Sequence, residues 1–208
     1  MSRKVPALQF FTRRLYARLS ATTLLLVLLG GAAGCGKPFN IKTRPDLPPA
    51  NYAASATSNN ISIQAQVLTD ENTLYDNFDA NLILAGILPV RVNLANAGTQ
   101  SVDLKKARLE IRAEGRLYKP VDARKAFKRL ISYYELSTFN KSGYNESRQD
   151  FAAFALDFNT PLEAGQTRQG LVFFAMPESS ARGTGLTLMV TRLDGTSDNR
   201  DRLELKLN

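Results

Sequence analysis

Apolar residues recur at every second position in several short segments of this chain. In 61–67 they alternate with serine and glutamine, and in 90–94 with arginine and asparagine. Because successive side chains of a β-strand point to opposite faces of its sheet, this spacing predicts strands with one buried face. Turn residues such as Asn96 and Gly98 separate the segments. Strands are expected within 61–67, 88–96, 109–113, 117–121, 151–158, 170–177, 186–190 and 203–207.

One segment has the spacing of a helix. Asp122 is a typical N-cap residue, and the apolar residues after it recur three or four positions apart, with cationic residues on the other face. The polar stretch 137–150 is expected to be a loop. Together the patterns predict a mainly β protein, an antiparallel β-sandwich of about seven or eight strands with one short helical insertion. The helix's apolar residues are Ala123, Phe127, Leu130, Ile131 and Tyr134, and its cations are Arg124, Lys125, Lys128 and Arg129.

Charge and composition exclude several classes of function. The chain has 27 Lys and Arg against 19 Asp and Glu, but residues 1–34 carry five of the cations and no acid, so the remainder has a net charge of only +3. Such a near balance does not favour nucleic acid as a partner. The sequence has no histidine and a single cysteine, Cys35. Ser-His-Asp and Cys-His nucleophiles, ordinary zinc sites and disulfides within the chain are therefore excluded.

The basic N-terminal segment leads into an apolar run that is too short to span a bilayer. Its densest part is LLLVLL, residues 24–29, whereas a transmembrane helix needs about 20 predominantly apolar residues. Small residues follow, and Cys35 comes directly after them. This order is typical of a cleaved signal peptide.

The sequence Ala32-Ala33-Gly34-Cys35 resembles the lipobox of bacterial lipoproteins, in which a small or aliphatic residue and two small residues precede a cysteine. The resemblance implies cleavage between Gly34 and Cys35, with diacylglycerol on the sulfur and a further acyl group on the new amino terminus. Two or more acyl chains anchor a protein stably, so the membrane is an expected partner through lipid on Cys35.

Gly36 bears on which membrane holds the protein. In lipoproteins of this resemblance an aspartate after the cysteine often signals retention at the inner membrane, so Gly36 implies the outer membrane, with the protein facing the periplasm. A signal peptide without lipid and an uncleaved membrane helix remain as alternatives. The segment 12–16 resembles a twin-arginine export motif, which leaves that route and the general secretory route both open.

Composition divides the rest of the chain. Residues 36–60 contain four prolines and many small polar residues without apolar periodicity, which is typical of a flexible linker. We therefore expect a signal peptide in 1–34, the lipidated cysteine and a linker in 35–60, and a β-sandwich domain in 61–208.

Two motifs of this domain, PVRVNLANAG in 89–98 and PLEAGQTRQGLVFFAMP in 161–177, resemble the immunoglobulin-like domains of bacterial lipoproteins of uncharacterised function. The first resembles a strand that ends in an Asn-containing turn. The second resembles a turn that leads into an aromatic core strand. The resemblance implies a fold and carries over no catalytic residue.

Acidic residues are the candidates for metal binding and hydrolysis. Clustered carboxylate and amide oxygens suit calcium, but the spacing here is not that of an EF-hand, and solvated turns are the alternative, so no metal or cofactor is expected. Paired carboxylates carry out glycoside hydrolysis without histidine, yet nothing in the sequence marks out a pair. The calcium candidates are Asp70, Glu71, Asn72, Asp76, Asn77 and Asp79, and a second acidic turn holds Asp194, Asp198 and Asp201. The scattered acids are Glu110, Glu114, Glu135, Glu146 and Asp150.

Aromatic residues around the predicted helix and loop are the candidates for partner contact. Exposed aromatic side chains anchor interfaces, although these residues suit equally well the end of a sandwich core. The candidates are Tyr133, Tyr134, Phe139 and Tyr144. Lys105, Lys106, Arg108 and Arg112 extend the basic face of the helix, which suits anionic headgroups or acidic polymers.

We therefore expect a membrane-anchored envelope lipoprotein that is not an enzyme and binds an envelope protein or a surface polymer. One alternative is a carrier that holds a lipid in a cavity between the sheets. Another is a hydrolase that uses a carboxylate pair. The carrier's cavity would be lined by Phe151, Phe154, Phe158, Phe173 and Phe174.

Overall fold

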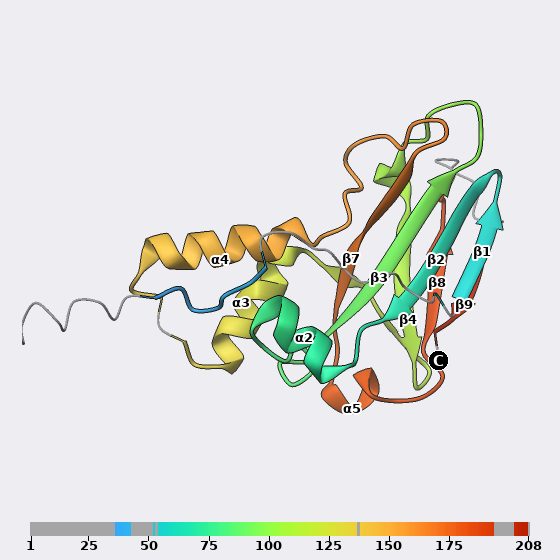
Figure 1. Cartoon of the computed structure of the whole chain (residues 1–208). Helices are drawn as coiled ribbons and strands as arrows, with labels where there is room; N and C mark the ends of the chain where they lie inside the picture. Colours follow the sequence, from blue (N-terminus) through green and yellow to red (C-terminus); the bar gives the residue numbers. More distant parts are fainter. Residues whose placement is uncertain (1–35, 43–51, 53, 137, 194–201, 208) are drawn as a thin grey trace, which may run out of the picture. The chain divides into compact units, whose positions relative to one another are not determined.

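Two antiparallel sheets form the body of the protein (Figure 1). The computed structural model describes residues 36–42, 52, 54–136, 138–193 and 202–207. The first sheet has the order β1-β2-β3-β7-β6 and the second the order β5-β4-β8-β9. The strands are β1 (Ala54–Ser58), β2 (Ile61–Val67), β3 (Ile87–Asn96), β4 (Arg108–Ala113), β5 (Arg116–Tyr118), β6 (Pro120–Val121), β7 (Thr167–Ala175), β8 (Thr187–Thr191) and β9 (Leu203–Lys206).

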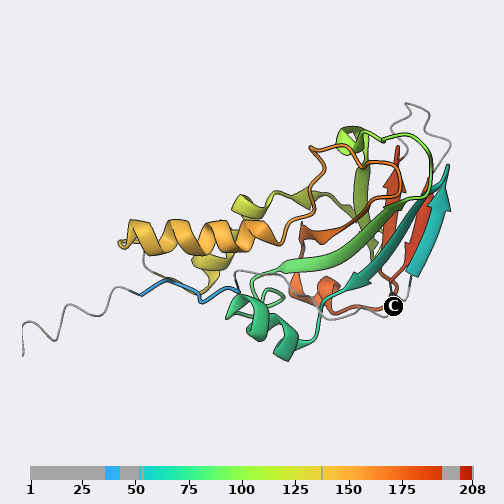
Figure 2. The same ribbon diagram turned by 45° about the horizontal axis from the view of Figure 1, so that its top comes forward.

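The alternation in the sequence corresponds to alternating burial. In β2 the residues Ile61, Ile63 and Ala65 are fully buried, while the residues between them are partly exposed. The central strands β3 and β7 are apolar on both faces at one end, and there the helices cover the face that the second sheet leaves open (Figure 2). The expectation of a mainly β, antiparallel protein is therefore confirmed.

An aromatic cluster joins the helices to the first sheet. The ring of Phe151 stacks on that of Phe173 in β7, with centroids 4.8 Å apart, and Phe78 packs against Phe151 and Phe154 at 5.5 and 4.6 Å. The helices are α2 (Glu71–Phe78), α3 (Ala123–Tyr133), α4 (Lys141–Ala153) and the short α5 (Glu178–Ala181), with a 3-10 turn, η2, at Leu104–Lys106.

Three of these helices correct the expectation of one helical insertion. Residues 141–153 form α4 and not a polar loop, so Phe151 lies on a helix and not on a strand. The Asn140 side chain caps α4 by accepting a hydrogen bond from the Gly143 amide at 3.1 Å. The buried face of α4 consists of Gly143, Ser147 and Phe151, and two of these are too small or too polar to give an apolar period. Residues 71–78, which hold most of the calcium candidates, form α2 and not a solvated turn.

The structure also corrects the expectation of a flexible linker in residues 36–60. Within 36–60, Phe39 and Ile41 are each only 4% exposed and belong to the core, and residues 54–58 form β1 along the edge of β2. The compact unit that contains both sheets begins at Lys37. The domain therefore begins well before residue 61. The predicted signal peptide, which ends at Gly34, and the predicted lipidation site Cys35 lie outside the described residues.

Candidate functional site

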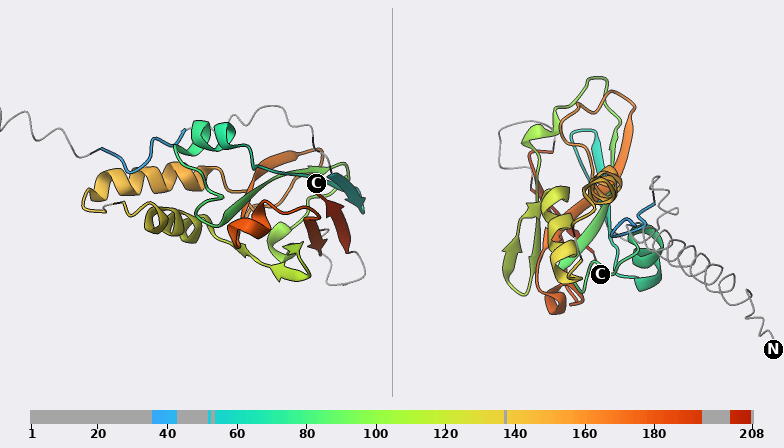
Figure 3. Two further views of the ribbon diagram at one scale, coloured as in Figure 1. Left: turned by 90° about the horizontal axis from the view of Figure 1, so that it is seen from below. Right: turned by 90° about the vertical axis from the view of Figure 1, so that its left-hand side faces the viewer.

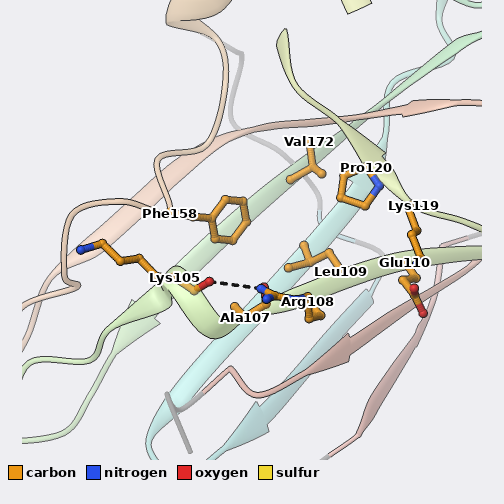
Figure 4. A pocket seen from close by; sticks show the side chains of 9 residues that line it. All are labelled: Lys105, Ala107, Arg108, Leu109, Glu110, Lys119, Pro120, Phe158 and Val172. Atoms are coloured by element: carbon orange, nitrogen blue, oxygen red, sulfur yellow. Dashed lines mark hydrogen bonds between the residues drawn. The ribbon is translucent and has the colours of Figure 1, made fainter. Parts of the chain in front are cut away.

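A groove lies between the two sheets, where β4 of one sheet approaches β6 and β7 of the other (Figure 4). It encloses about 440 Å³, and a neighbouring hollow of about 310 Å³ shares Pro120, Phe158 and Val172 with it. The chain creates this opening by passing from the second sheet to the first between Tyr118 and Pro120. We call it the sheet-edge groove; its lining is Lys105, Ala107, Arg108, Leu109, Glu110, Lys119, Pro120, Phe158 and Val172.

The groove is apolar in the centre and cationic at its sides. Figure 4 shows Phe158, Val172 and Leu109 around the centre, with Lys105 and Lys119 on opposite sides. Arg108 is held in place, because its Nη1 donates to the carbonyls of Lys105 at 3.1 Å and Ala107 at 3.0 Å. Such a surface suits an extended segment that carries apolar groups and negative charge.

Chemistry by paired carboxylates finds no support in this groove. Glu110 is the only carboxylate among its lining residues, all of which the structure describes. The other candidate acids lie elsewhere: Glu114 accepts a hydrogen bond from Ser180 at 3.0 Å, and Glu146 and Asp150 both bind the Lys37 ammonium. Glu135 is exposed at the end of α3.

Away from the sheet-edge groove, a basic hollow of about 350 Å³ lies between α3 and α4. Asp122 caps α3 by accepting from the Lys125 amide at 2.8 Å, as the sequence predicts, and it is the single acid of the lining. Arg148 lies over the Tyr144 ring, 5.8 Å from its centroid. Four cations against one acid make this hollow attractive to anions. The cations are Arg124, Lys125, Lys128 and Arg148.

The four aromatic candidates divide into two pairs. Tyr134 and Tyr144 pack against the core: the Tyr134 hydroxyl accepts from the Asn81 amide at 3.0 Å, and the Tyr144 ring lies 5.5 Å from that of Phe127. Burial raises the pKa of Tyr134. Tyr133 is 49% exposed and Phe139 is 96% exposed, so only these two present a large apolar surface to a partner.

Residues 37–42, which we call the docked segment, are bound along α2, α3 and α4. The Phe39 ring packs edge-on against Phe127 and Tyr134, with centroids 6.2 and 5.8 Å away. The Ser147 hydroxyl donates to the Phe39 backbone carbonyl at 2.8 Å. The Lys42 amide donates to the Asn77 backbone carbonyl at 3.0 Å. The composition of residues 36–60 does not reveal this segment, although two apolar residues two positions apart, Phe39 and Ile41, are a strand-like signal within a polar stretch.

Lys37 fixes the beginning of the docked segment. Its Nζ lies 2.6 Å from Glu146 and 3.6 Å from Asp150 on α4. The hydrogen bond to Glu146 is the main cause that raises the pKa of the Lys37 ammonium above its ordinary value. The two carboxylates therefore serve as an anchor for the chain.

The acidic calcium candidates hold local structure together. Asp70 caps α2 by accepting from the Thr73 amide at 2.8 Å, Glu71 pairs with Arg182 at 3.1 Å, and Asp79 accepts from the Asn40 amide at 3.0 Å. In the part of the chain that the structure describes, no three acidic or cysteine side chains come together as metal ligands. Asp194, Asp198 and Asp201 lie outside the described residues.

Four of the five phenylalanines of the carrier hypothesis are buried in the core, although Phe173 also borders the hollow next to the sheet-edge groove. Phe151, Phe154, Phe173 and Phe174 are each at most 2% exposed. Phe158 alone of the five borders the sheet-edge groove. Among the described helices, none combines the length and the apolar character that crossing a bilayer requires.

Solved structures with a distant likeness to this chain include two bacterial proteins. No family model matches the chain, and no curated protein matches it. A functionally unknown protein from Listeria monocytogenes EGD-e is 11% identical over 74% of this chain and 81% of its own, with a TM-score of 0.41. A lipoprotein candidate (ycdA) from Bacillus subtilis is 12% identical over 72% of this chain, with a TM-score of 0.38. The chain spans 37% of the length of the Bacillus protein.

Proposed function

We propose that this protein is an envelope lipoprotein, cleaved before Cys35 and held by lipid on that cysteine, whose immunoglobulin-like sandwich binds a partner without catalysis. The lipobox-like sequence 32–35 supports the anchor, and Gly36 supports the outer membrane, with the domain facing the periplasm. The partner is an envelope protein or a surface polymer.

The sheet-edge groove is the observation that carries the binding role. Phe158 in its apolar centre is partly exposed, whereas the neighbouring lining residues Leu109 and Val172 are buried, at 4% and 5% exposure. Lys105 and Lys119 add positive charge on either side. An extended, acidic segment of a partner with one or two apolar groups would satisfy both features.

Crosslinking in living cells tests the binding role. A photo-reactive amino acid replaces Lys119 in the groove, and a matched variant carries it at Thr57, which is exposed on β1 at the opposite edge of the first sheet. We expect a discrete crosslinked product from position 119 and not from position 57. Equal labelling at both positions, or none at 119, contradicts the proposed groove.

Lipidation has its own test. Labelled palmitate is expected to enter the wild-type protein and not Cys35→Ser. Incorporation into both proteins, or into neither, contradicts the anchor on Cys35.

A further inference from the structure

The docked segment fixes where the chain enters the domain. A Cβ atom placed on Gly143 would lie 3.2 Å from the Lys37 Cα, so Lys37 lies against the first turn of α4. Asn140 caps this turn, and Phe139 directly precedes Asn140. The entry point therefore lies at the end of the domain where α3 leads into α4.

Cys35 is only two residues from this entry point. Two residues of fully extended chain span at most about 7 Å, so the Cα atom of Cys35 lies within that distance of the Lys37 Cα. A flexible linker through residue 60 would instead give a separation of roughly 25–30 Å. Because the lipid of a lipoprotein lies in the bilayer, a short connection holds the entry point near the headgroups.

The side chains around the entry point suit a membrane interface. Phe139 is 96% exposed and Tyr133 49% exposed, and Lys141 is exposed two residues beyond Phe139. Aromatic and cationic side chains are the residues that gather at the boundary between headgroups and acyl chains. We call this surface the helical tip; it consists of Tyr133, Thr138, Phe139 and Lys141.

The side of α4 that faces α3 is basic, whereas the side that faces α2 exposes acidic residues. The basic hollow between α3 and α4 includes Tyr144, about one helical turn beyond Lys141 of the helical tip, and anionic headgroups attract its cations. The helix α2 lies on the other side of α4, as Figure 3 shows in its end-on view, and exposes Glu71 and Asp76. Contact through the α3–α4 side therefore fits an anionic bilayer better than contact through α2.

We propose that the helical tip rests on the membrane that holds the lipid on Cys35, with Phe139 in the headgroup region and the two sheets directed away from the bilayer. The proposal rests on the lipidation proposed above. It assigns to Phe139 and Tyr133 a lipid surface as their partner.

A fluorescent probe measures this orientation in the lipidated protein. Lipidation occupies the thiol of Cys35, so an added cysteine is the one free thiol for an environment-sensitive dye. Thr138→Cys places the dye on the helical tip beside an intact Phe139, and Ser101→Cys places it on the exposed loop between β3 and η2 as the matched control. Each protein is inserted into vesicles of phosphatidylethanolamine and phosphatidylglycerol whose acyl chains carry a quencher.

We expect strong quenching and a blue-shifted emission at position 138 and neither at position 101. Adding Phe139→Ser to the Thr138→Cys protein should reduce the quenching several-fold, because the side chain that enters the headgroup region is removed. Equal quenching at 138 and 101, or quenching at 138 that Phe139→Ser leaves unchanged, overturns the proposal. Mass spectrometry of the same samples separates the lipoprotein proposal from the orientation proposal. A Cys35 without lipid overturns the lipoprotein proposal itself. A lipidated Cys35 with an unquenched dye at position 138 overturns only the orientation.

Discussion

Phe39 shows how much one side chain contributes in a polar stretch. It is 4% exposed and contacts two aromatic rings, so Phe39→Ala leaves a cavity between α3 and the docked segment. We expect the free energy of unfolding to fall by about 3–5 kcal/mol. Phe139→Ala is the matched control, because its exposed ring should change stability by less than about 0.5 kcal/mol. Urea denaturation of the full chain in detergent measures both, and equal losses would contradict the burial of Phe39.

Asp70 should make stability depend on pH. The hydrogen bond from the Thr73 hydroxyl is the main cause that lowers the pKa of Asp70, and the Thr73 amide adds to it. A lowered folded-state pKa gives stability that is fully present above the unfolded value of about 3.9 and lost as the pH falls through the folded value. The melting temperature of Asp70→Asn should therefore lie below that of the wild type at neutral pH and converge with it as the pH falls through the folded-state pKa of Asp70.

The same prediction has an internal control. In a Thr73→Ala background the hydrogen bond from the hydroxyl is gone, so Asp70→Asn should lower the melting temperature by a smaller amount at neutral pH than it does in the wild type. A loss that stays constant from neutral to acid pH would show that the charge of Asp70 contributes nothing.

At the scale of elements, the sequence predicted the strands and helices whose buried residues recur at the regular spacing of a strand or of a helix. The strands β2 and β4 and the helix α3 have their buried apolar residues on one face, and their positions agree with the prediction. The helix α4 was missed because Gly143 and Ser147 form most of its buried face, and α2 because its apolar residues are few among acids and amides. The sheet-edge groove combines β4, β6 and β7, and no local pattern reveals which strands approach each other across two sheets.

Gly170 tests how closely β7 approaches the segment that follows α4. A Cβ atom at this position of β7 would lie 2.5 Å from the Leu156 Cα, where the Leu156 amide donates to the Leu171 carbonyl at 2.9 Å. We expect Gly170→Ala to lower the free energy of unfolding by about 1–3 kcal/mol, because backbone has to move. Thr167→Ala, exposed in the same strand, should have little effect, and equal thermal stability of the two variants would contradict this packing.

At the scale of the whole molecule, the domain boundary sets the length of the connection between the domain and the proposed lipid on Cys35. Composition favoured a linker in 36–60, because proline and small polar residues are typical of linkers. Phe39 and Ile41 are nevertheless buried, because they contact helices that lie far along the chain. Sequence periodicity carries no information on such contacts. Docking replaces a long flexible connection with a short one, so the orientation of the domain depends on the strength of this docking.

Truncation measures that strength. A chain that begins at Lys37 and one that begins at Asn51 differ by the docked segment and residues 43–50, and each of the two buried apolar side chains contributes about 1.5–3 kcal/mol. We expect the shorter chain to melt roughly 10 °C lower. Phe39→Ala with Ile41→Ala in the longer chain should reproduce most of this loss, which separates docking from chain length. Since about 3 kcal/mol corresponds to an equilibrium constant above 100, such a result means that the segment is released in fewer than about one molecule in a hundred, and the entry point stays beside α4. Equal melting temperatures for the two chains would instead return residues 37–42 to the role of a linker and free the helical tip from the bilayer.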